Sequence, residues 1–176
     1  MKIEVISYNP IWPIQFESEK SAIESSLGDV VVGVHHVGST AVEGLAAKPI
    51  IDIILEVRSL ESLDQSTPKL ELMGYEAKGE FGIPGRRYFR KGRSQRTHQI
   101  HTFKTGDHNI FRHLAFRDYL SRHPDARREY QELKIKLAMD CNDDLDFYCD
   151  GKDTFVKHHE ARAIEWKKGV SAGKSG

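Results

Sequence analysis

The sequence has few cysteines and no excess charge of either sign, and both features limit what the protein can be. Its 176 residues contain two cysteines, Cys141 and Cys149, which are too few for a disulfide framework and lack C-x-x-C spacing. We therefore expect reduced thiols in a cytoplasmic protein. Because 26 Lys and Arg residues balance 26 Asp and Glu residues, a polycation that coats nucleic acid is excluded, although a local basic patch is not.

Long hydrophobic runs are also missing. No apolar run reaches the roughly 20 residues that a membrane helix needs, and the start, MKIEVISYNP, lacks the basic-then-apolar pattern of a signal peptide. An apolar fraction of 39% is too high for a disordered chain, whereas a charged fraction of 30% is too high for a membrane protein. We expect residues 1–168 to form a single domain with no membrane partner, followed by a flexible tail over 169–176.

Hydrophobic patterning in the first part of the chain predicts helices on either side of two strands. Residues 9–28 have the spacing and terminal residues of a helix. The β-branched segment 30–37 and the apolar segment 50–57 are typical of buried strands. Residues 59–73 suit one or two short helices, because Pro68 interrupts their pattern.

After Gly74 the pattern changes to that of antiparallel strands. The segments YEAKGEF, RRYFRKG and RTHQIHTF alternate residue types, with glycine and proline between them. Helices are predicted over 110–122, from Pro124 onward and over 153–168. This order of elements predicts an α+β fold with a mixed, largely antiparallel sheet. We expect the helices to pack mainly on one face and to leave the other face available to a ligand.

The most informative segment for function is residues 35–54, where a strand ends in a small-residue turn and the chain returns on a second strand. Gly38 lets a phosphate approach the backbone, and Ser39 and Thr40 add hydroxyl donors beside the N–H groups of a helix start. Asp52 on the returning strand can hold a divalent cation that bridges phosphates. The alternative is an ordinary turn and helix cap, with Asp52 bonded to the backbone.

Several blocks of this sequence resemble known families. Gly-Ser after a strand, followed by a strand carboxylate, resembles the signature of the nucleotidyltransferase superfamily. More closely, HVGSTAV-x-GLAAKPIIDI, GIPGRRYFRK, RTH-x-x-H-x-F and HLAFRDYLSRHP resemble the GrpB-like family, in the same order and over nearly the whole chain. The resemblance implies a bacterial cytosolic protein with a nucleotidyltransferase-like fold, but it brings no established reaction. Glu43 departs from the family pattern, in which proline is usual, and places an extra negative charge near the proposed site.

The carboxylate pair that the superfamily resemblance implies is incomplete. Active nucleotidyltransferases carry two carboxylates one residue apart, so that both face the metal. The same-facing neighbours of Asp52 are the apolar Ile50 and Ile54. Replacement ligands can come from His98 or His101, and because strand side chains alternate, only one of them faces the site unless a bulge intervenes. We favour His101 as the catalytic and metal-binding partner of Asp52, with His98 as the alternative and Mg²⁺ or another divalent cation as the metal.

Residues 86–96 form a basic segment, in which six of eleven residues are cationic and none is acidic. On a strand, Arg86 and Arg90 face one side and Arg87 faces the other. Because guanidinium groups bind phosphate bidentately, these three arginines are candidate phosphate-binding residues, together with Lys48. The alternatives are a solvated hairpin whose arginines pair with acids and, less favoured for a short patch on a neutral chain, a nucleic-acid surface.

Arg117 is the last candidate for the phosphate site. It lies one turn after His113 on a predicted helix, and Tyr130 and Lys134 have the same spacing on the next helix, so either pair can aim polar groups into a site. Since acidic residues such as Asp118 lie nearby, ordinary surface pairing is the alternative.

Two main functional hypotheses follow from these residues. The first is a nucleotidyltransferase-like enzyme that binds a nucleotide or another phosphorylated small molecule and transfers a nucleotidyl or phosphoryl group, with Asp52 and His101 as the catalytic pair. The second is a non-catalytic module that binds the same class of ligand, because the second carboxylate is missing. An RNA-binding accessory factor is a third and less favoured hypothesis, which depends on the basic segment.

Overall fold

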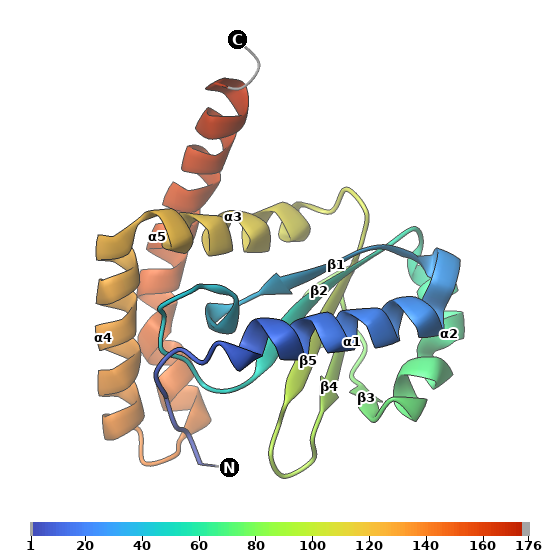
Figure 1. Cartoon of the computed structure of the whole chain (residues 1–176), viewed down its shortest axis with the longest axis horizontal. Helices are drawn as coiled ribbons and strands as arrows, with labels where there is room; N and C mark the ends of the chain where they lie inside the picture. The colour runs from blue at the N-terminus through green and yellow to red at the C-terminus, as the bar shows by residue number, and fades with distance from the viewer. Residues whose placement is uncertain (1, 174–176) are drawn as a thin grey trace.

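A computed structural model gives the structure of the protein and describes residues 2–173. The described residues contain five strands, which form one sheet (Figure 1). The strands are Val31–Val37 (β1), Ile51–Val57 (β2), Tyr75–Ala77 (β3), Arg87–Lys91 (β4) and His98–Lys104 (β5). Their order is β1-β2-β5-β4-β3, with β2 and β5 parallel and the other neighbours antiparallel. The sheet is therefore mixed and largely antiparallel, as predicted.

Five α-helices and two 3₁₀ turns accompany the sheet in the part of the chain that the structure describes. The helices are Ile11–Leu27 (α1), Leu60–Leu72 (α2), His108–Arg122 (α3), Pro124–Asp140 (α4) and Leu145–Gly173 (α5). The 3₁₀ turns are Gly28–Val30 (η1) and Ser39–Ala41 (η2). Pro68 lies inside one continuous α2, which starts at a Ser59 cap whose side chain accepts the Ser62 N–H.

Helices α1 and α2 cover one face of the sheet. Trp12, Phe16 and Ile23 line the inward side of α1 and are at most 6% exposed. They belong to a core cluster that also contains Ile53 of β2 and Leu63 of α2. Burying a large apolar side chain contributes about 1.5–3 kcal/mol to stability. This layer therefore fixes the position of β2, the strand that carries the candidate aspartate.

The opposite face of the sheet is partly covered by α3. Ile54 of β2 and Phe103 of β5 are fully buried in a cluster with Ile110 of α3. Helices α4 and α5 pack with α3 in a separate cluster that includes Tyr130. We expected this face to be available to a ligand, and instead α3 covers the part around Ile54. The part around Asp52 borders a cavity.

The beginning of α5 differs most from its predicted position. The helix begins at Leu145 rather than Asp153, so residues 145–152, for which no helix was predicted, form its first two turns. A Cβ atom at Gly151 would collide with the side chain of Leu137 on α4. The glycine is therefore used for close packing of α5 against α4, and it does not end the helix.

Helix α5 also extends further than predicted. It continues to Gly173 and so includes the first part of the segment, 169–176, that we expected to be a flexible tail. The rest of that segment, 174–176, lies outside the described residues. Across residues 2–173, no helix combines the length and the apolar character that would let it cross a membrane.

Candidate functional site

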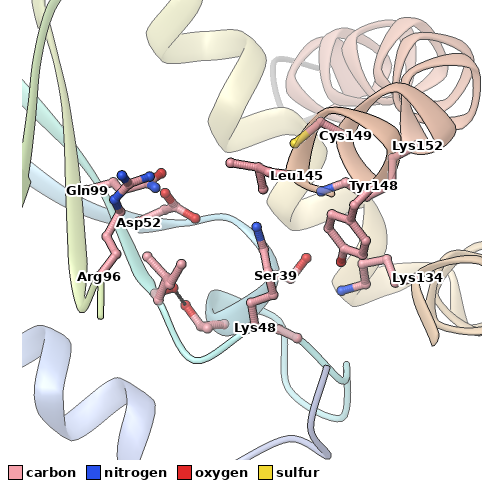
Figure 2. Close-up of a pocket in the computed structure, with 13 residues that line it drawn as sticks. Ser39, Lys48, Asp52, Arg96, Gln99, Lys134, Leu145, Tyr148, Cys149 and Lys152 are labelled. Carbon is pink, nitrogen blue, oxygen red and sulfur yellow. Dashed lines mark hydrogen bonds between the residues drawn. The ribbon is translucent and has the colours of Figure 1, made fainter. Parts of the chain in front are cut away.

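A cavity of about 250 Å³ lies between the ends of β2 and β5 and helices α4 and α5. Figure 2 shows Asp52, Arg96 and Gln99 on the strand side, and Lys134, Tyr148 and Lys152 on the helical side. The lining also includes Ser39, Thr40, Lys48 and Cys149. Within residues 2–173 this lining has four cationic side chains and one carboxylate, that of Asp52. The cavity is therefore strongly basic, although the whole chain is neutral.

The turn after β1 brings its backbone directly against Asp52. Gly38 has φ +75°, a conformation that residues with a Cβ rarely adopt. A Cβ atom at this position would lie 2.6 Å from Oδ2 of Asp52. Glycine is therefore required here for two reasons, its backbone conformation and the space occupied by the carboxylate.

Asp52 is held by two residues of β5 that share its face of the sheet. His101 Nε2 lies 3.3 Å from Asp52 Oδ1. Gln99, with its amide oriented to satisfy its neighbours, donates to the same oxygen at 3.0 Å and accepts from Arg96 Nη1 at 3.3 Å. Because β2 and β5 are parallel and in register, Asp52 pairs directly with Gln99. Arg96 was not among the predicted site residues, although it ends the basic segment.

Arg86 determines which nitrogen of His101 carries the proton. Arg86 Nη1 lies 3.5 Å from His101 Nδ1. A guanidinium group can only donate, so Nδ1 accepts and Nε2 donates its proton to Asp52. In this tautomer the carboxylate of Asp52 accepts a hydrogen bond from the Nε2–H of His101.

His98 does not reach the site. It lies on the opposite face of β5, where its Nε2 is 3.8 Å from Glu19 of α1. This is the alternation that we expected from the three-residue spacing of His98 and His101. Within residues 2–173 no group of three or more His, Cys, Asp or Glu side chains is arranged to hold a metal ion. The donor set, with Asp52 as its one carboxylate, therefore does not fit a resident divalent cation.

The two hydroxyl residues of the turn have different surroundings. Thr40 is 1% exposed, and its Oγ1 lies 2.9 Å from His36 Nε2 and 3.4 Å from the carbonyl oxygen of Ile50. Its hydroxyl is thus engaged within the protein and ties the turn to both strands. Ser39 is less buried and lines the cavity, where it also forms a side-chain hydrogen bond with Tyr130.

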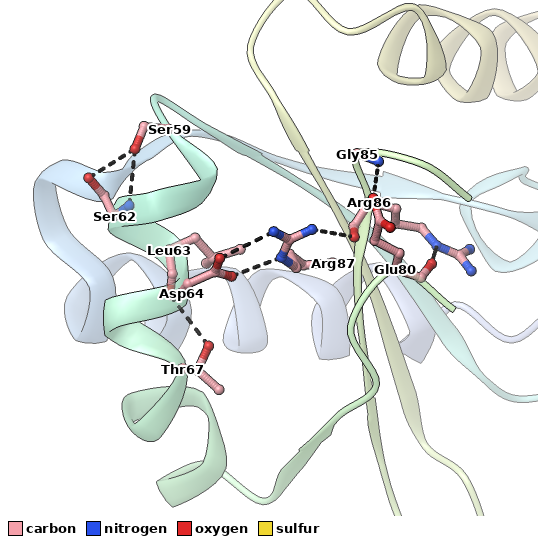
Figure 3. Close-up of polar contacts among 9 residues, drawn as sticks. All are labelled: Ser59, Ser62, Leu63, Asp64, Thr67, Glu80, Gly85, Arg86 and Arg87. Atoms are coloured by element: carbon pink, nitrogen blue, oxygen red, sulfur yellow. Dashed lines mark hydrogen bonds and ion pairs between the residues drawn. The ribbon is translucent and has the colours of Figure 1, made fainter. Parts of the chain in front are cut away.

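Three predicted arginines do not line the cavity. Arg87 forms a two-pronged ion pair with Asp64 of α2, at 2.9 and 3.2 Å (Figure 3). Arg90 pairs with Glu76 of β3 at 3.3 Å. Arg86 is 8% exposed and donates to the carbonyl oxygens of Glu80 and Phe81. These three arginines therefore stabilise the hairpin and the elements next to it. This is the alternative considered above, in which the arginines of the basic segment pair with acids.

Arg117 and Glu43 also lie outside the lining of the cavity. Arg117 donates to the carbonyl oxygen of His36 at 3.1 Å and pairs with Asp118 at 2.9 Å, so it links α3 to β1. Glu43 is exposed. The extra negative charge that we expected near the site therefore points to solvent, and the basic character of the cavity is preserved.

Sequence reasoning missed the lining residues of α5, such as Tyr148 and Lys152, whereas on α4 it named Lys134, with Tyr130, as a pair that can aim polar groups into a site. Lys134 is 2% exposed and donates to the carbonyl oxygen of Ala46. Burial, together with the positive charges of Lys152 and Lys48, lowers the pKa of Lys134 to about 7. Burial and Lys48 lower the pKa of Lys152 to about 8. One signal was present in the sequence, because Lys134 falls on the same helical stripe as Tyr130 and is a charged residue in an apolar pattern.

Comparison with known proteins places this arrangement in a family. Residues 2–162 match the family described as GrpB protein. The chain belongs to this family. A crystal structure of conserved protein GrpB from Enterococcus faecalis is similar, with a TM-score of 0.90, 42% identity, and coverage of 93% of this chain and 99% of that one. UPF0157 protein YqkA of Bacillus subtilis (strain 168) is 45% identical over 96% of this chain.

Several of the similar proteins are longer than this chain. The chain spans about half (49%) of the length of the Bacillus subtilis relative. It also matches a dephospho-CoA kinase of Mycolicibacterium paratuberculosis, with 28% identity over 93% of this chain and 46% of that protein. The fold is similar to that of the Cid1 poly(U) polymerase, with a TM-score of 0.53, 15% identity, and coverage of 75% and 45%. The nucleotidyltransferase-like fold predicted for this GrpB-family chain is thus confirmed.

Proposed function

We propose that the cavity of this GrpB-family protein binds a nucleotide or another phosphorylated small molecule. The observation that carries the proposal is the lining itself, in which four cationic side chains face one carboxylate within about 250 Å³. Cations gathered in a partly buried cavity repel one another, and an anion of several charges relieves that repulsion. This volume lies just below the usual range for ligand sites, about 300–1,000 Å³, and suits a small molecule.

The comparisons support a nucleotide as the class of ligand. The Cid1 poly(U) polymerase, which shares the fold, has been solved as a complex described as MgGTP bound. The relative from Mycolicibacterium paratuberculosis is named for dephospho-CoA, which makes that compound a second ligand to test. These names describe those proteins, and for this chain they define the panel of compounds.

The test is isothermal titration calorimetry against AMP, ADP, ATP and dephospho-CoA, in buffers with and without Mg²⁺. Adenosine, which lacks phosphate, is the matched control ligand. We expect phosphorylated compounds to bind and adenosine to bind far more weakly or not at all. If no phosphorylated compound binds in either buffer, or if adenosine binds as well as AMP, the proposal is wrong.

A second candidate function is transfer of a nucleotidyl or phosphoryl group. The observation that favours it is the hydrogen bond between Asp52 and His101 beside the cavity, because a carboxylate held in this way can accept a proton from an attacking hydroxyl. The apolar Ile50 and Ile54 on either side of Asp52 leave no second carboxylate. Turnover of ATP that is lost in Asp52→Asn while ATP binding persists would support transfer. Binding without turnover would favour the non-catalytic module.

A further inference from the structure

The cavity has two ends of different character. At the strand end, Asp52 and Arg96 carry opposite charges and both hydrogen-bond to Gln99. At the helical end, Lys48 and Lys152 lie over the ring of Tyr148, and Lys134 carries a like charge in the same lining (Figure 2). The strand end is therefore close to neutral, whereas the helical end holds three positive charges.

The lysines of the helical end have few partners within the protein. Lys48 Nζ lies 4.9 Å and Lys152 Nζ lies 4.5 Å from the centre of the Tyr148 ring. Within residues 2–173 none of the three lysines forms an ion pair with a carboxylate, and Lys134 has the carbonyl oxygen of Ala46 as its one hydrogen-bond acceptor. An ammonium group has three N–H donors, so most of this donor capacity is available to a ligand.

The strand end repels phosphate unless a metal intervenes. The carboxylate of Asp52 accepts hydrogen bonds from Gln99 and His101, and a negative charge at close range disfavours a bound anion. A nucleotidyltransferase overcomes this repulsion with metal ions held by paired carboxylates, whereas here the apolar Ile50 and Ile54 lie on either side of Asp52. A carboxylate is, however, a good acceptor for hydroxyl groups.

We propose that the phosphates of the ligand bind to Lys48, Lys134 and Lys152 at the helical end, that Asp52 accepts hydroxyl groups of the ligand, and that a chain of two or more phosphates binds without a divalent cation. This inference rests on the proposed function and adds the orientation of the ligand and its class, a hydroxyl-bearing diphosphate or triphosphate. In it, the lysines supply the positive charge that metal ions supply in other proteins of this fold.

The titration of the lysines agrees with this arrangement. The groups facing Lys134 and Lys152 are Lys48, Tyr130, Tyr148, Cys149 and Asp52. Burial and mutual repulsion place the pKa of Lys134 at about 7 and that of Lys152 at about 8. A bound polyphosphate favours the charged form of each amine, so binding near pH 8 is expected to take up protons from the buffer.

The experiment is calorimetric titration of the protein with inorganic pyrophosphate and tripolyphosphate, first in EDTA and then with excess Mg²⁺. We expect both probes to bind in EDTA and to bind no more tightly with Mg²⁺, because the metal neutralises part of their charge. At pH 8, the heats measured in Tris and in HEPES are expected to differ, since the two buffers have different ionisation enthalpies and protons are taken up.

Variants separate the two ends of the cavity. Lys152→Gln is expected to weaken pyrophosphate binding about tenfold or more. The control is Lys157→Gln, which changes an exposed lysine on the same helix that pairs with Asp153, and it is expected to bind as the wild type does. Asp52→Asn removes the repelling charge and is expected to keep or increase the affinity for pyrophosphate.

The remaining outcomes contradict either the inferred position of the phosphates or the proposed function itself. Binding that requires Mg²⁺ and is lost in Asp52→Asn would place the phosphates at the strand end with a metal, and would overturn this inference while leaving the proposed function intact. Unchanged binding by Lys152→Gln, with Lys134→Met also unchanged, would overturn it too. If nucleotides and pyrophosphate all fail to bind in both buffers, the proposed function itself is wrong.

Discussion

At the scale of single residues, Lys134 is a buried amine that costs the fold stability, and the proposed ligand site gives a reason for its presence. Its side chain is 2% exposed, and the nearby charges, Lys48 and Lys152, have the same sign. A buried amine without an acidic partner costs free energy on folding, because either its charge is desolvated or its proton is released. Perturbed groups of this kind are common at functional sites, where they are retained for binding.

Replacing this amine is therefore expected to stabilise the fold. We expect Lys134→Met to raise the free energy of unfolding at pH 7 by about 1–3 kcal/mol, since methionine has similar length and no charge to bury. The pKa is about 7 in the folded chain against an ordinary value of 10.5. Between these values the unfolded chain binds the extra proton, so wild-type stability rises with pH across this range. The advantage of Lys134→Met should thus shrink from pH 7 to pH 9.5.

Urea unfolding of Lys134→Met and of the wild type at pH 7, 8 and 9.5 measures the difference in their free energies of unfolding. The titration of groups that both proteins contain cancels in this difference. Lys136→Met is the matched control, because Lys136 lies on the same helix, is mostly exposed and pairs with Asp140. We expect little change in this variant at any of the three pH values. A Lys134→Met protein that is less stable than the wild type at pH 7 would show that the bond to Ala46 outweighs the burial of the amine.

At the scale of elements, periodicity predicted which side chains share a strand face but not which elements meet. The alternation along β5 correctly put His101 and Gln99 on one face, and the alternation along β4 put Arg87 on the face opposite to Arg90. Alternation along a strand did not predict which helix or loop contacts each face of the sheet. Arg87 is engaged by Asp64, which lies on a helix that no local pattern connects to β4.

The part of the helical wall that α5 supplies was not predicted, for the same reason. The first turns of α5 have an acidic sequence with a glycine at position 151, which favours a loop when only neighbouring residues are considered. Contact between Gly151 and Leu137 of α4 overrides that preference. Lys152 and Tyr148 are placed in the cavity by this packing between helices, so their role depends on tertiary structure and could not be read from spacing.

A buried polar network joins α1 to the sheet and gives a prediction at this scale. Glu19 of α1 accepts from the hydroxyl of Tyr75 at 2.6 Å and from Lys91 at 2.9 Å, and His98 is 3.8 Å away. Burial by itself raises the pKa of Glu19, but these hydrogen bonds and charges outweigh it and lower the pKa below its ordinary value. The ionised carboxylate therefore stabilises the contact between α1, β3, β4 and β5.

We expect Glu19→Gln to lower the free energy of unfolding by about 1–2 kcal/mol at pH 7, because the amide keeps the Tyr75 bond but loses the charge. Since the pKa is lowered in the folded state, this contribution is present above the ordinary pKa of about 4.5 and is lost as the pH falls through the folded value. The difference between variant and wild type should therefore narrow in acid. Glu24→Gln, at an exposed position of the same helix, is the control.

Chemical denaturation at pH 7, 5 and 4 provides the measurement for the Glu19 network. A difference between Glu19→Gln and the wild type that stays constant over this pH range would mean that the carboxylate contributes through packing rather than through its charge. An equal loss in Glu24→Gln would mean that helix propensity alone is responsible.

At the scale of the whole molecule, positive charge is concentrated in the interior cavity, and the rest of the molecule carries a small excess of negative charge. The chain has no formal net charge, and four cations are gathered in the cavity. On the outside, two arginines of the basic segment form ion pairs, Arg87 with Asp64 and Arg90 with Glu76. A long polyanion sees the paired surface, whereas a small anion can enter the cavity. This distribution favours a small phosphorylated ligand over RNA.

The distribution predicts how the protein responds to single-stranded RNA. Nucleic-acid binding through Lys and Arg releases counterions and weakens steeply with salt, in proportion to the number of phosphates neutralised. We expect no saturable binding of a 5′-hydroxyl RNA of about 20 nucleotides at about 150 mM salt, measured by fluorescence anisotropy. The same RNA with a 5′-triphosphate distinguishes binding in the cavity from binding on the surface, because its triphosphate end can enter the cavity.

The basic segment would be identified as an RNA surface by one result. In that result, the 5′-hydroxyl RNA binds, its binding falls steeply with salt, and the binding is lost in Arg87→Gln or in Arg93→Gln, an exposed position of the hairpin. Binding confined to the 5′-triphosphate RNA and lost in Lys152→Gln would instead identify the cavity as the site that reads phosphate.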